Sequence, residues 1–125
     1  MEKICLDFEA ALDFLRGDNA ILEKLKYYLA SENICITSFT MLFLFQSLRK
    51  PDLVTAFVNQ VTVLPFDGKS AQLAAAINHE LEDGPKAGSK RLEDIMTAAI
   101  CISNDAFLFS RNPSRYDGIK GLRKV

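Results

Sequence analysis

The chain has 125 residues, of which 49% are hydrophobic and 25% are charged, and this length is sufficient for one domain with its own core. Its formal net charge of −1 argues against a polycation of the histone type, although it leaves room for a local basic face. We therefore predict a single domain over residues 1–125.

The three cysteines lie in apolar or strand-like segments and form no Cys-x-x-Cys pair. Such a set is typical of small core residues in a cytoplasmic protein, and less typical of disulfides or metal ligands. The N-terminal segment does not resemble a signal peptide. The longest apolar stretch, at residues 39–45, is too short to span a bilayer. We therefore expect a cytoplasmic protein that does not bind membranes.

Predicted elements of the first half alternate between apolar strands and helices. In chain order they are a strand, two helices, a strand and a helix, at residues 3–6, 10–15, 20–30, 33–37 and 39–49. Ser38 is expected to cap the last of these helices, because a serine hydroxyl at this position can accept a backbone amide.

The second half begins at Pro51, which is typical of the first turn of a helix. The predicted elements are a helix, a strand, two helices and a strand, at residues 52–59, 60–64, 67–82, 92–103 and 106–109. A flexible loop is expected at 84–90, where glycines and a proline gather. Residues 121–125 are a candidate for a last short strand.

Strands that alternate with helices predict an α/β fold, a three-layer α/β/α arrangement around a short parallel sheet. In open parallel sheets the ligand crevice lies beyond the carboxyl ends of the strands. Asp7 directly follows the first strand, so its carboxylate is expected to lie at this crevice. The alternative is that Asp7 only caps the following helix.

Asp94 lies in the first turns of a helix that continues as a strongly apolar segment. Burial of an unpaired carboxylate is costly, so Asp94 needs a partner. If its helix packs along the first strand, Asp94 and Asp7 converge, and two close carboxylates usually share a proton or a divalent cation. The alternative is a half-solvated aspartate near the positive helix N-terminus.

Two further segments are candidates for binding surfaces. The aromatic run Phe39–Phe45 is too broad for one amphipathic stripe, so it is either core on two sides or core plus a partner surface, and we favour the second. The C-terminal third is richer in lysine and arginine than the rest. It is either a solvated face or a track for a phosphate backbone.

Six short motifs, in this order, resemble the PIN-domain ribonucleases, and most closely the VapC toxins of toxin–antitoxin pairs. Each motif is weak by itself, but the ordered set covers essentially the whole chain. The motifs are Leu6-Asp7-Phe8-Glu9-Ala10-Ala11-Leu12, Leu15-Arg16-Gly17-Asp18, Ile36-Thr37-Ser38-Phe39-Thr40, Val63-Leu64-Pro65-Phe66-Asp67, Asp94-Ile95-Met96-Thr97-Ala98-Ala99-Ile100 and Ser110-Arg111-Asn112 with Tyr116 and Gly121-Leu122.

The resemblance implies an endoribonuclease that holds Mg²⁺ or Mn²⁺ with acidic residues at the carboxyl edge of the sheet. The metal would activate a water molecule and stabilise charge on the RNA phosphate. Asp7 matches the first acid of the family and Asp94 the third, and both are implied to be catalytic metal ligands. Glu9 stands where the family has a small hydroxyl or amide, and if the chain is a ribonuclease we expect Glu9 to be an added ligand or general base and Asn112 an orienting group. A homodimer and a small antitoxin protein are the implied partners, together with RNA.

Two of the family's acid positions depart from its pattern. Phe43 stands where the second acid is expected, and Arg115 stands where the fourth is expected. The acidic site is therefore partly lost, and metal binding is expected to be weak or absent. Arg115 could take the electrostatic place of the cation by pairing with Asp7 or Asp94. Two functions stay open: a metal-dependent endoribonuclease, and a catalytically inactive PIN-fold module that binds RNA or a protein partner.

Overall fold

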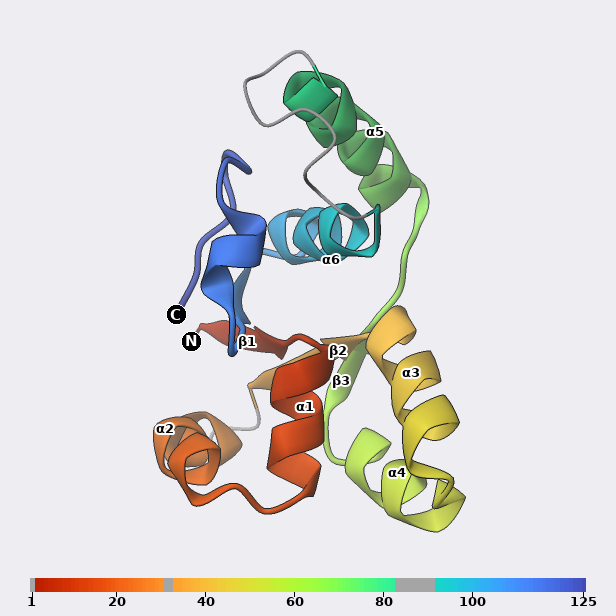
Figure 1. The fold of residues 1–125 in the computed structure, drawn as a ribbon, viewed down its shortest axis with the longest axis vertical. Coiled ribbons are helices and arrows are strands. Elements are labelled where there is room, and N and C mark those ends of the chain that lie inside the picture. The colour runs from red at the N-terminus through yellow and green to blue at the C-terminus, as the bar shows by residue number, and fades with distance from the viewer. Residues whose placement is uncertain (1, 31–32, 83–91) are drawn as a thin grey trace.

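The computed structural model describes residues 2–30, 33–82 and 92–125, so the loop predicted at 84–90 lies outside the described residues. One parallel sheet forms the centre of the molecule (Figure 1). Its spatial order is β3-β2-β1-β4. The strands are β1 (Lys3–Leu6), β2 (Ile34–Thr37), β3 (Thr62–Leu64) and β4 (Ala106–Phe109).

The register of the sheet brings several strand ends to one edge. Leu6 at the end of β1 pairs with Ile36 of β2 and with Phe109 of β4. Because parallel strands in register end together, the residues that follow them lie side by side at the carboxyl edge. Asp7 therefore lies at the edge where the sequence places it.

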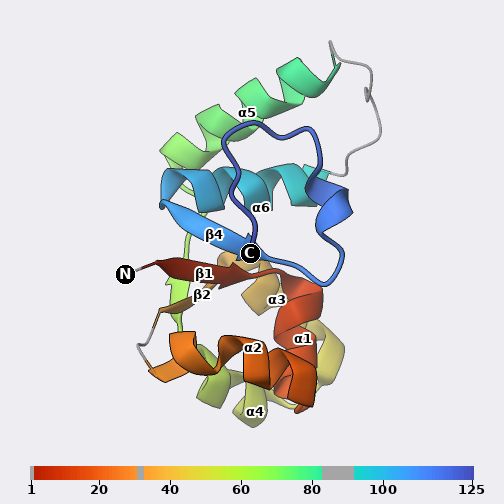
Figure 2. The ribbon, with the colours of Figure 1, turned by 90° about the vertical axis from the view of Figure 1, so that its left-hand side faces the viewer.

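Helices cover both faces of the sheet, and this confirms the predicted three-layer α/β/α fold (Figures 1 and 2). The first four helices lie on one face and the last two on the other. In chain order they are α1 (Phe8–Leu15), α2 (Asn19–Ala30), α3 (Ser38–Leu48), α4 (Pro51–Val58), α5 (Gly68–Glu82) and α6 (Leu92–Ser103). A short 3-10 helix, η1 (Pro113–Tyr116), follows β4.

The side chains of the central strands point alternately to the two faces of the sheet, and this divides the core into two clusters. Cys5 and Cys35 pack with α5 and α6, whereas Ile4 and Ile36 pack with the helices of the other face. Side chains of successive strand residues point to opposite faces, so a short apolar strand supplies both clusters. All three cysteines are buried and free, as the sequence predicts.

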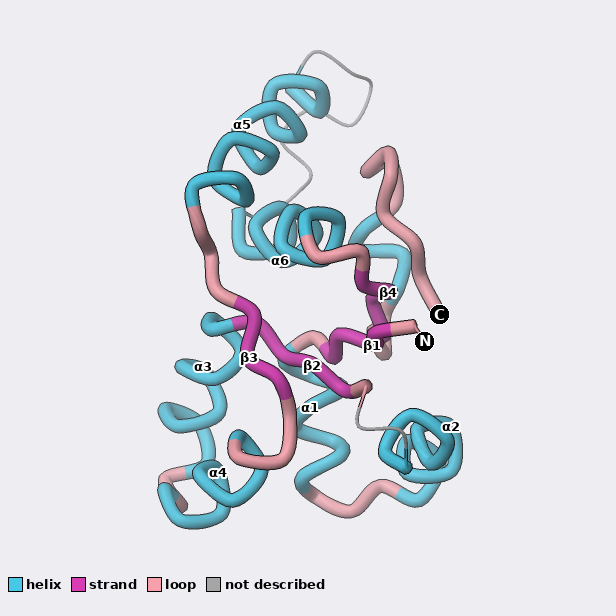
Figure 3. Tube along the Cα trace, turned by 180° about the vertical axis from the view of Figure 1, so that it is seen from behind, coloured by secondary structure: helices cyan, strands magenta, loops and turns pink. Residues whose placement is uncertain are grey.

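Two local predictions need correction. Thr37, and not Ser38, caps α3: the Thr37 hydroxyl oxygen accepts the Thr40 amide at 3.1 Å, because β2 stays extended through Thr37 and the helix already includes Ser38. The candidate strand at 121–125 is a loop (Figure 3), which joins β4 by a single parallel bridge between Lys124 and Leu108. Among the described residues no helix is both long and apolar enough to cross a membrane.

Candidate functional site

A cleft of about 490 Å³ opens at the carboxyl edge of the sheet. The starts of α1 and α6, the side of α3 and the helix η1 form its walls. The lining includes four acids, Asp7, Glu9, Glu93 and Asp94, which we name the acidic wall, and three phenylalanines, Phe8, Phe39 and Phe43, which we name the aromatic wall. Arg115 and Tyr116 reach into the cleft from η1. The predicted convergence of Asp7 and Asp94 is confirmed, since both line this one cleft.

Asp7 both caps α1 and lines the cleft, so the position at the crevice and the role as a helix cap, which were alternatives in the sequence, are both correct. Its Oδ1 accepts the backbone amide of Ala10 at 3.0 Å. Its Oδ2 accepts the hydroxyl of Tyr116 at 3.3 Å. Asp7 is only 4% exposed, and this burial raises the pKa of its carboxyl above the ordinary value, while its hydrogen bonds act in the opposite direction.

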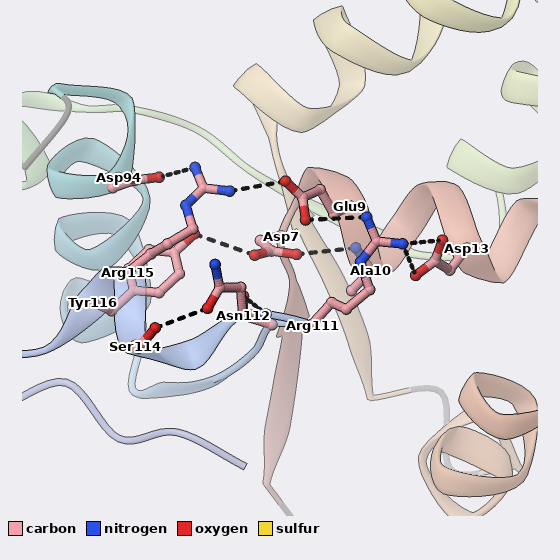
Figure 4. A network of polar contacts seen from close by, with 11 residues as sticks. Asp7, Glu9, Ala10, Asp13, Asp94, Arg111, Asn112, Ser114, Arg115 and Tyr116 are labelled. Atoms are coloured by element: carbon pink, nitrogen blue, oxygen red, sulfur yellow. Dashed lines mark hydrogen bonds and ion pairs between the residues drawn. The ribbon is translucent and has the colours of Figure 1, made fainter.

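Arg115 joins two acids that come from different elements (Figure 4). Its Nη2 lies 2.7 Å from Asp94 Oδ1 on α6, and its Nη1 lies 3.0 Å from Glu9 Oε1 on α1. The Asp94 side chain is 6% exposed and the Arg115 side chain 21%. We name this arrangement the inner bridge. Asp94 is one of the two partners that the sequence predicts for Arg115, and Glu9 is an addition.

A second arginine binds the same glutamate from outside the cleft. Arg111 Nη2 lies 3.3 Å from Glu9 Oε2, and Arg111 Nη1 lies 3.2 Å from Asp13 Oδ2. The Arg111 side chain is 58% exposed. We name this arrangement the outer bridge. Both bridges are drawn in Figure 4.

Tyr116 is a buried residue of the cleft to which the sequence assigned no role. It is 3% exposed, and burial together with the negative charges of Asp7 and Asp94 raises the pKa of its phenol far above the ordinary value. The phenol therefore stays protonated and donates to Asp7. A signal was present in the sequence, because Tyr116 is a lone aromatic residue in the polar segment that follows β4.

Asn112 is placed outside the lining of the cleft. It precedes η1, is exposed, and its Oδ1 accepts the hydroxyl of Ser114 at 2.8 Å. Its role as an orienting group stays a prediction. Phe43, in contrast, lies in the cleft, where its ring meets the ring of Phe8 edge-on with 5.8 Å between centroids. An aromatic wall thus stands where the resemblance implies an acid.

The described residues, as they are arranged, do not fit a divalent cation. A hard cation needs several oxygen ligands that converge on one point. Among the described residues no group of three or more Asp, Glu, His or Cys side chains is placed to hold an ion. The guanidinium of Arg115 already joins Glu9 and Asp94, two of the three acids predicted as ligands. Binding of Mg²⁺ or Mn²⁺ stays a prediction that this arrangement does not favour.

Searches against protein-family models and against curated proteins give no match. Solved structures match along almost the whole chain. A chain of DNA-bound VapBC from Salmonella typhimurium superposes with a TM-score of 0.78 at 23% identity, over 100% of this chain and 98% of that one. A chain of VapBC2 from Rickettsia felis, bound to a promoter DNA fragment, gives 0.78 at 16% identity, over 98% and 96%. This chain has a PIN-like fold.

A third match is a chain of a toxin–antitoxin complex from Klebsiella pneumoniae, with a TM-score of 0.76 at 15% identity, over 98% of this chain and 100% of that one. At these identities the matches establish only the fold, and they show that it extends over 98–100% of the chain. The fold that the sequence motifs imply is therefore confirmed. The chemistry of the cleft has to be argued from its own residues.

Proposed function

We propose that this chain is a PIN-fold module of the toxin–antitoxin type that works by holding a segment of a protein partner in its cleft. One observation carries the proposal: the cleft combines an acidic wall with an aromatic wall. A segment that presents arginine or lysine beside apolar side chains matches both walls, because charge complementarity and apolar contact act together.

The net charge of the cleft lining supports a cationic occupant over RNA. The guanidinium of Arg115 already occupies Glu9 and Asp94, but carboxylates still outnumber cations among the described residues of the lining. Four carboxylates and one guanidinium line the cleft among the described residues, and a phosphate backbone is repelled by such a lining unless cations intervene. The structural matches to VapBC and to a toxin–antitoxin complex are consistent with a protein partner.

The aromatic wall supplies the apolar half of the binding surface. Phe39 and Phe43 lie on α3 and reach the cleft, while Leu44 of the same helix is fully buried in the core. The run at 39–45 is therefore core on one side and surface on the other, and the role of this surface in binding a partner is part of the proposal. Aromatic side chains that are rigid and partly exposed are typical anchors of protein interfaces.

The test is titration of the purified protein with a fluorescent amphipathic peptide that carries arginine beside leucine. We expect binding that weakens with salt, and no binding of the same peptide with glutamate in place of arginine. Phe43→Ser should weaken binding, whereas Leu53→Ser should not, because Leu53 is an exposed apolar residue of α4 that does not line the cleft. Equal affinity for both peptides, or equal loss in both variants, rejects the proposal.

A metal-dependent endoribonuclease is the second candidate. It is favoured by the presence of Asp7 and Asp94, with Glu93, in one cleft, and it requires Arg115 to release its two acids. Incubation of structured RNAs with Mn²⁺ or Mg²⁺ tests it, with Asp7→Asn as the matched variant. Cleavage by the wild type and not by Asp7→Asn would establish this candidate. The homodimer implied by the resemblance is tested in the same preparation by light scattering.

A further inference from the structure

We propose that Arg115 is a built-in counter-ion that takes the place of a divalent cation between Glu9 and Asp94. The protein then holds its acidic cleft together with a covalently attached charge, and a soluble cation has to compete with that charge. This inference rests on the same cleft as the proposed function, but it needs no partner, so the two can be tested separately.

The geometry of the inner bridge is that of a cross-link between elements. Glu9 lies on α1, next to the end of β1, and Asp94 lies at the start of α6. One guanidinium reaches both, at 3.0 Å and 2.7 Å (Figure 4). A divalent cation joins carboxylates from separate elements in the same way, but it does so with an ion taken from solution. The planar fork of arginine is suited to this task because its donors are fixed relative to one another.

Arg115 is held in place by its neighbour in the chain. Tyr116 is 3% exposed and its hydroxyl lies 3.3 Å from Asp7. This anchor positions η1 against the edge of the sheet, so the guanidinium is presented to the acids with little further loss of freedom. Arginine also keeps its charge at every ordinary pH. The bridge is therefore present whether or not a metal ion is available.

Burial of Asp94 explains why a soluble cation competes poorly. The Asp94 side chain is 6% exposed, so removal of the guanidinium without replacement leaves a buried charge without this partner, at considerable cost. A metal ion therefore has to compensate for the loss of the guanidinium contacts and for the loss of its own bound water before it gains carboxylate ligands. Without the guanidinium of Arg115, one oxygen of Glu9 and one of Asp94 lose this donor next to Asp7 in the same cleft, while Arg111 still holds the other oxygen of Glu9. Carboxylate oxygens of this kind suit Mn²⁺ and Mg²⁺.

The test is calorimetric titration of the isolated chain with MnCl₂. We expect weak or no binding to the wild type, and an affinity about tenfold or more higher in Arg115→Gln, which corresponds to roughly 1.4 kcal/mol. Arg111→Gln is the matched control, because it removes the other arginine that binds Glu9 and leaves the inner bridge intact; its Mn²⁺ affinity should equal that of the wild type. Adding Asp94→Asn to Arg115→Gln should abolish the gain.

Two results overturn the inference: tight Mn²⁺ binding by the wild type that is lost in Asp94→Asn, or no gain in an Arg115→Gln protein whose circular dichroism shows that it is folded. If Arg115→Gln does not fold, Arg115→Lys replaces it, since one ammonium cannot span both acids as the fork does, and a smaller gain is expected. Peptide binding without this gain rejects the counter-ion alone. The gain without peptide binding rejects the proposed function alone.

Discussion

The inner and outer bridges consist of the same types of charged group, but they lie in different surroundings. Arg115 and Arg111 come from the same segment after β4, and each contacts Glu9 and one aspartate. The side chain of Arg111 is 58% exposed and that of Arg115 is 21% exposed. The outer bridge contacts two residues of one helix, Glu9 and Asp13, whereas the inner bridge joins α1 to α6.

This difference shows that burial and connectivity decide what an ion pair contributes. Exposed pairs typically contribute about 0–1 kcal/mol, because water screens the charges and long side chains lose entropy. Removing one partner of a buried pair costs much more, because the other charge is left in a poorly solvated place. Removing one partner of the inner bridge should therefore destabilise the fold, whereas removing one partner of the outer bridge should scarcely affect it.

The largest expected effect follows from breaking the inner bridge. Arg115→Ala should lower the free energy of unfolding by about 2–3 kcal/mol, because it removes two charge-assisted hydrogen bonds and leaves Asp94 buried. Urea unfolding followed by circular dichroism measures this. A loss no greater than that of Arg111→Ala would contradict the contrast between the two bridges.

Asp7 is a useful contrast to both bridges, because the donors described for its carboxylate are a backbone amide and a phenol and not a guanidinium. Asp7→Ala should lower the free energy of unfolding by about 1 kcal/mol relative to Asp7→Asn, since asparagine keeps the helix cap and alanine does not. Thermal unfolding at one pH compares the two variants. Equal stability of both would show that the cap contributes little.

The pH dependence of Asp7 differs in sign from that of an ordinary paired carboxylate. Its pKa is raised in the folded state, chiefly by burial, so the folded protein binds this proton more tightly than the unfolded chain. Stability from this group is present at low pH and is lost as pH rises through the raised pKa. Asp7→Asn should therefore be more stable relative to the wild type at neutral pH than at acid pH. A stability difference that does not change with pH would refute this assignment.

Tyr116→Phe should have a smaller effect, about 0.5–1 kcal/mol, because it removes one neutral donor from a carboxylate that keeps its backbone partner. The hydroxyl of Tyr116 lowers the pKa of Asp7, so the variant should raise that pKa further. Carboxyl NMR titration of both proteins reads the change. A lower pKa of Asp7 in the variant would exclude the hydrogen bond as described.

The smallest effect belongs to the outer bridge. Arg111→Ala should change the free energy of unfolding by about 0.5 kcal/mol or less, and the difference should vanish as salt increases. Denaturant unfolding at low and high ionic strength provides the measurement. A loss of several kcal/mol would mean that Glu9 depends on Arg111 more than on Arg115.

The local pattern of apolar and polar residues accounts for most of what the sequence predicts correctly about this molecule. Strand and helix positions follow from the spacing of apolar residues, which is why β1 and α6 lie where the sequence predicts them. The edge position of Asp7 follows too, because in-register parallel strands end together. Element boundaries were less predictable: α3 begins at Ser38, one residue earlier than predicted, so the capping residue shifts from Ser38 to Thr37.

The partners of Arg115, in contrast, were determined only by the tertiary structure. Pairing with Asp94 was one of two sequence hypotheses, and the contact with Glu9 was not foreseen. Arg115 lies 21 residues from Asp94 and 106 residues from Glu9 along the chain. Apolar periodicity acts between near neighbours, whereas this contact requires η1 to turn back across the sheet edge, where the burial of Tyr116 holds it. Whether the cleft needs a metal ion is therefore decided by how distant segments pack.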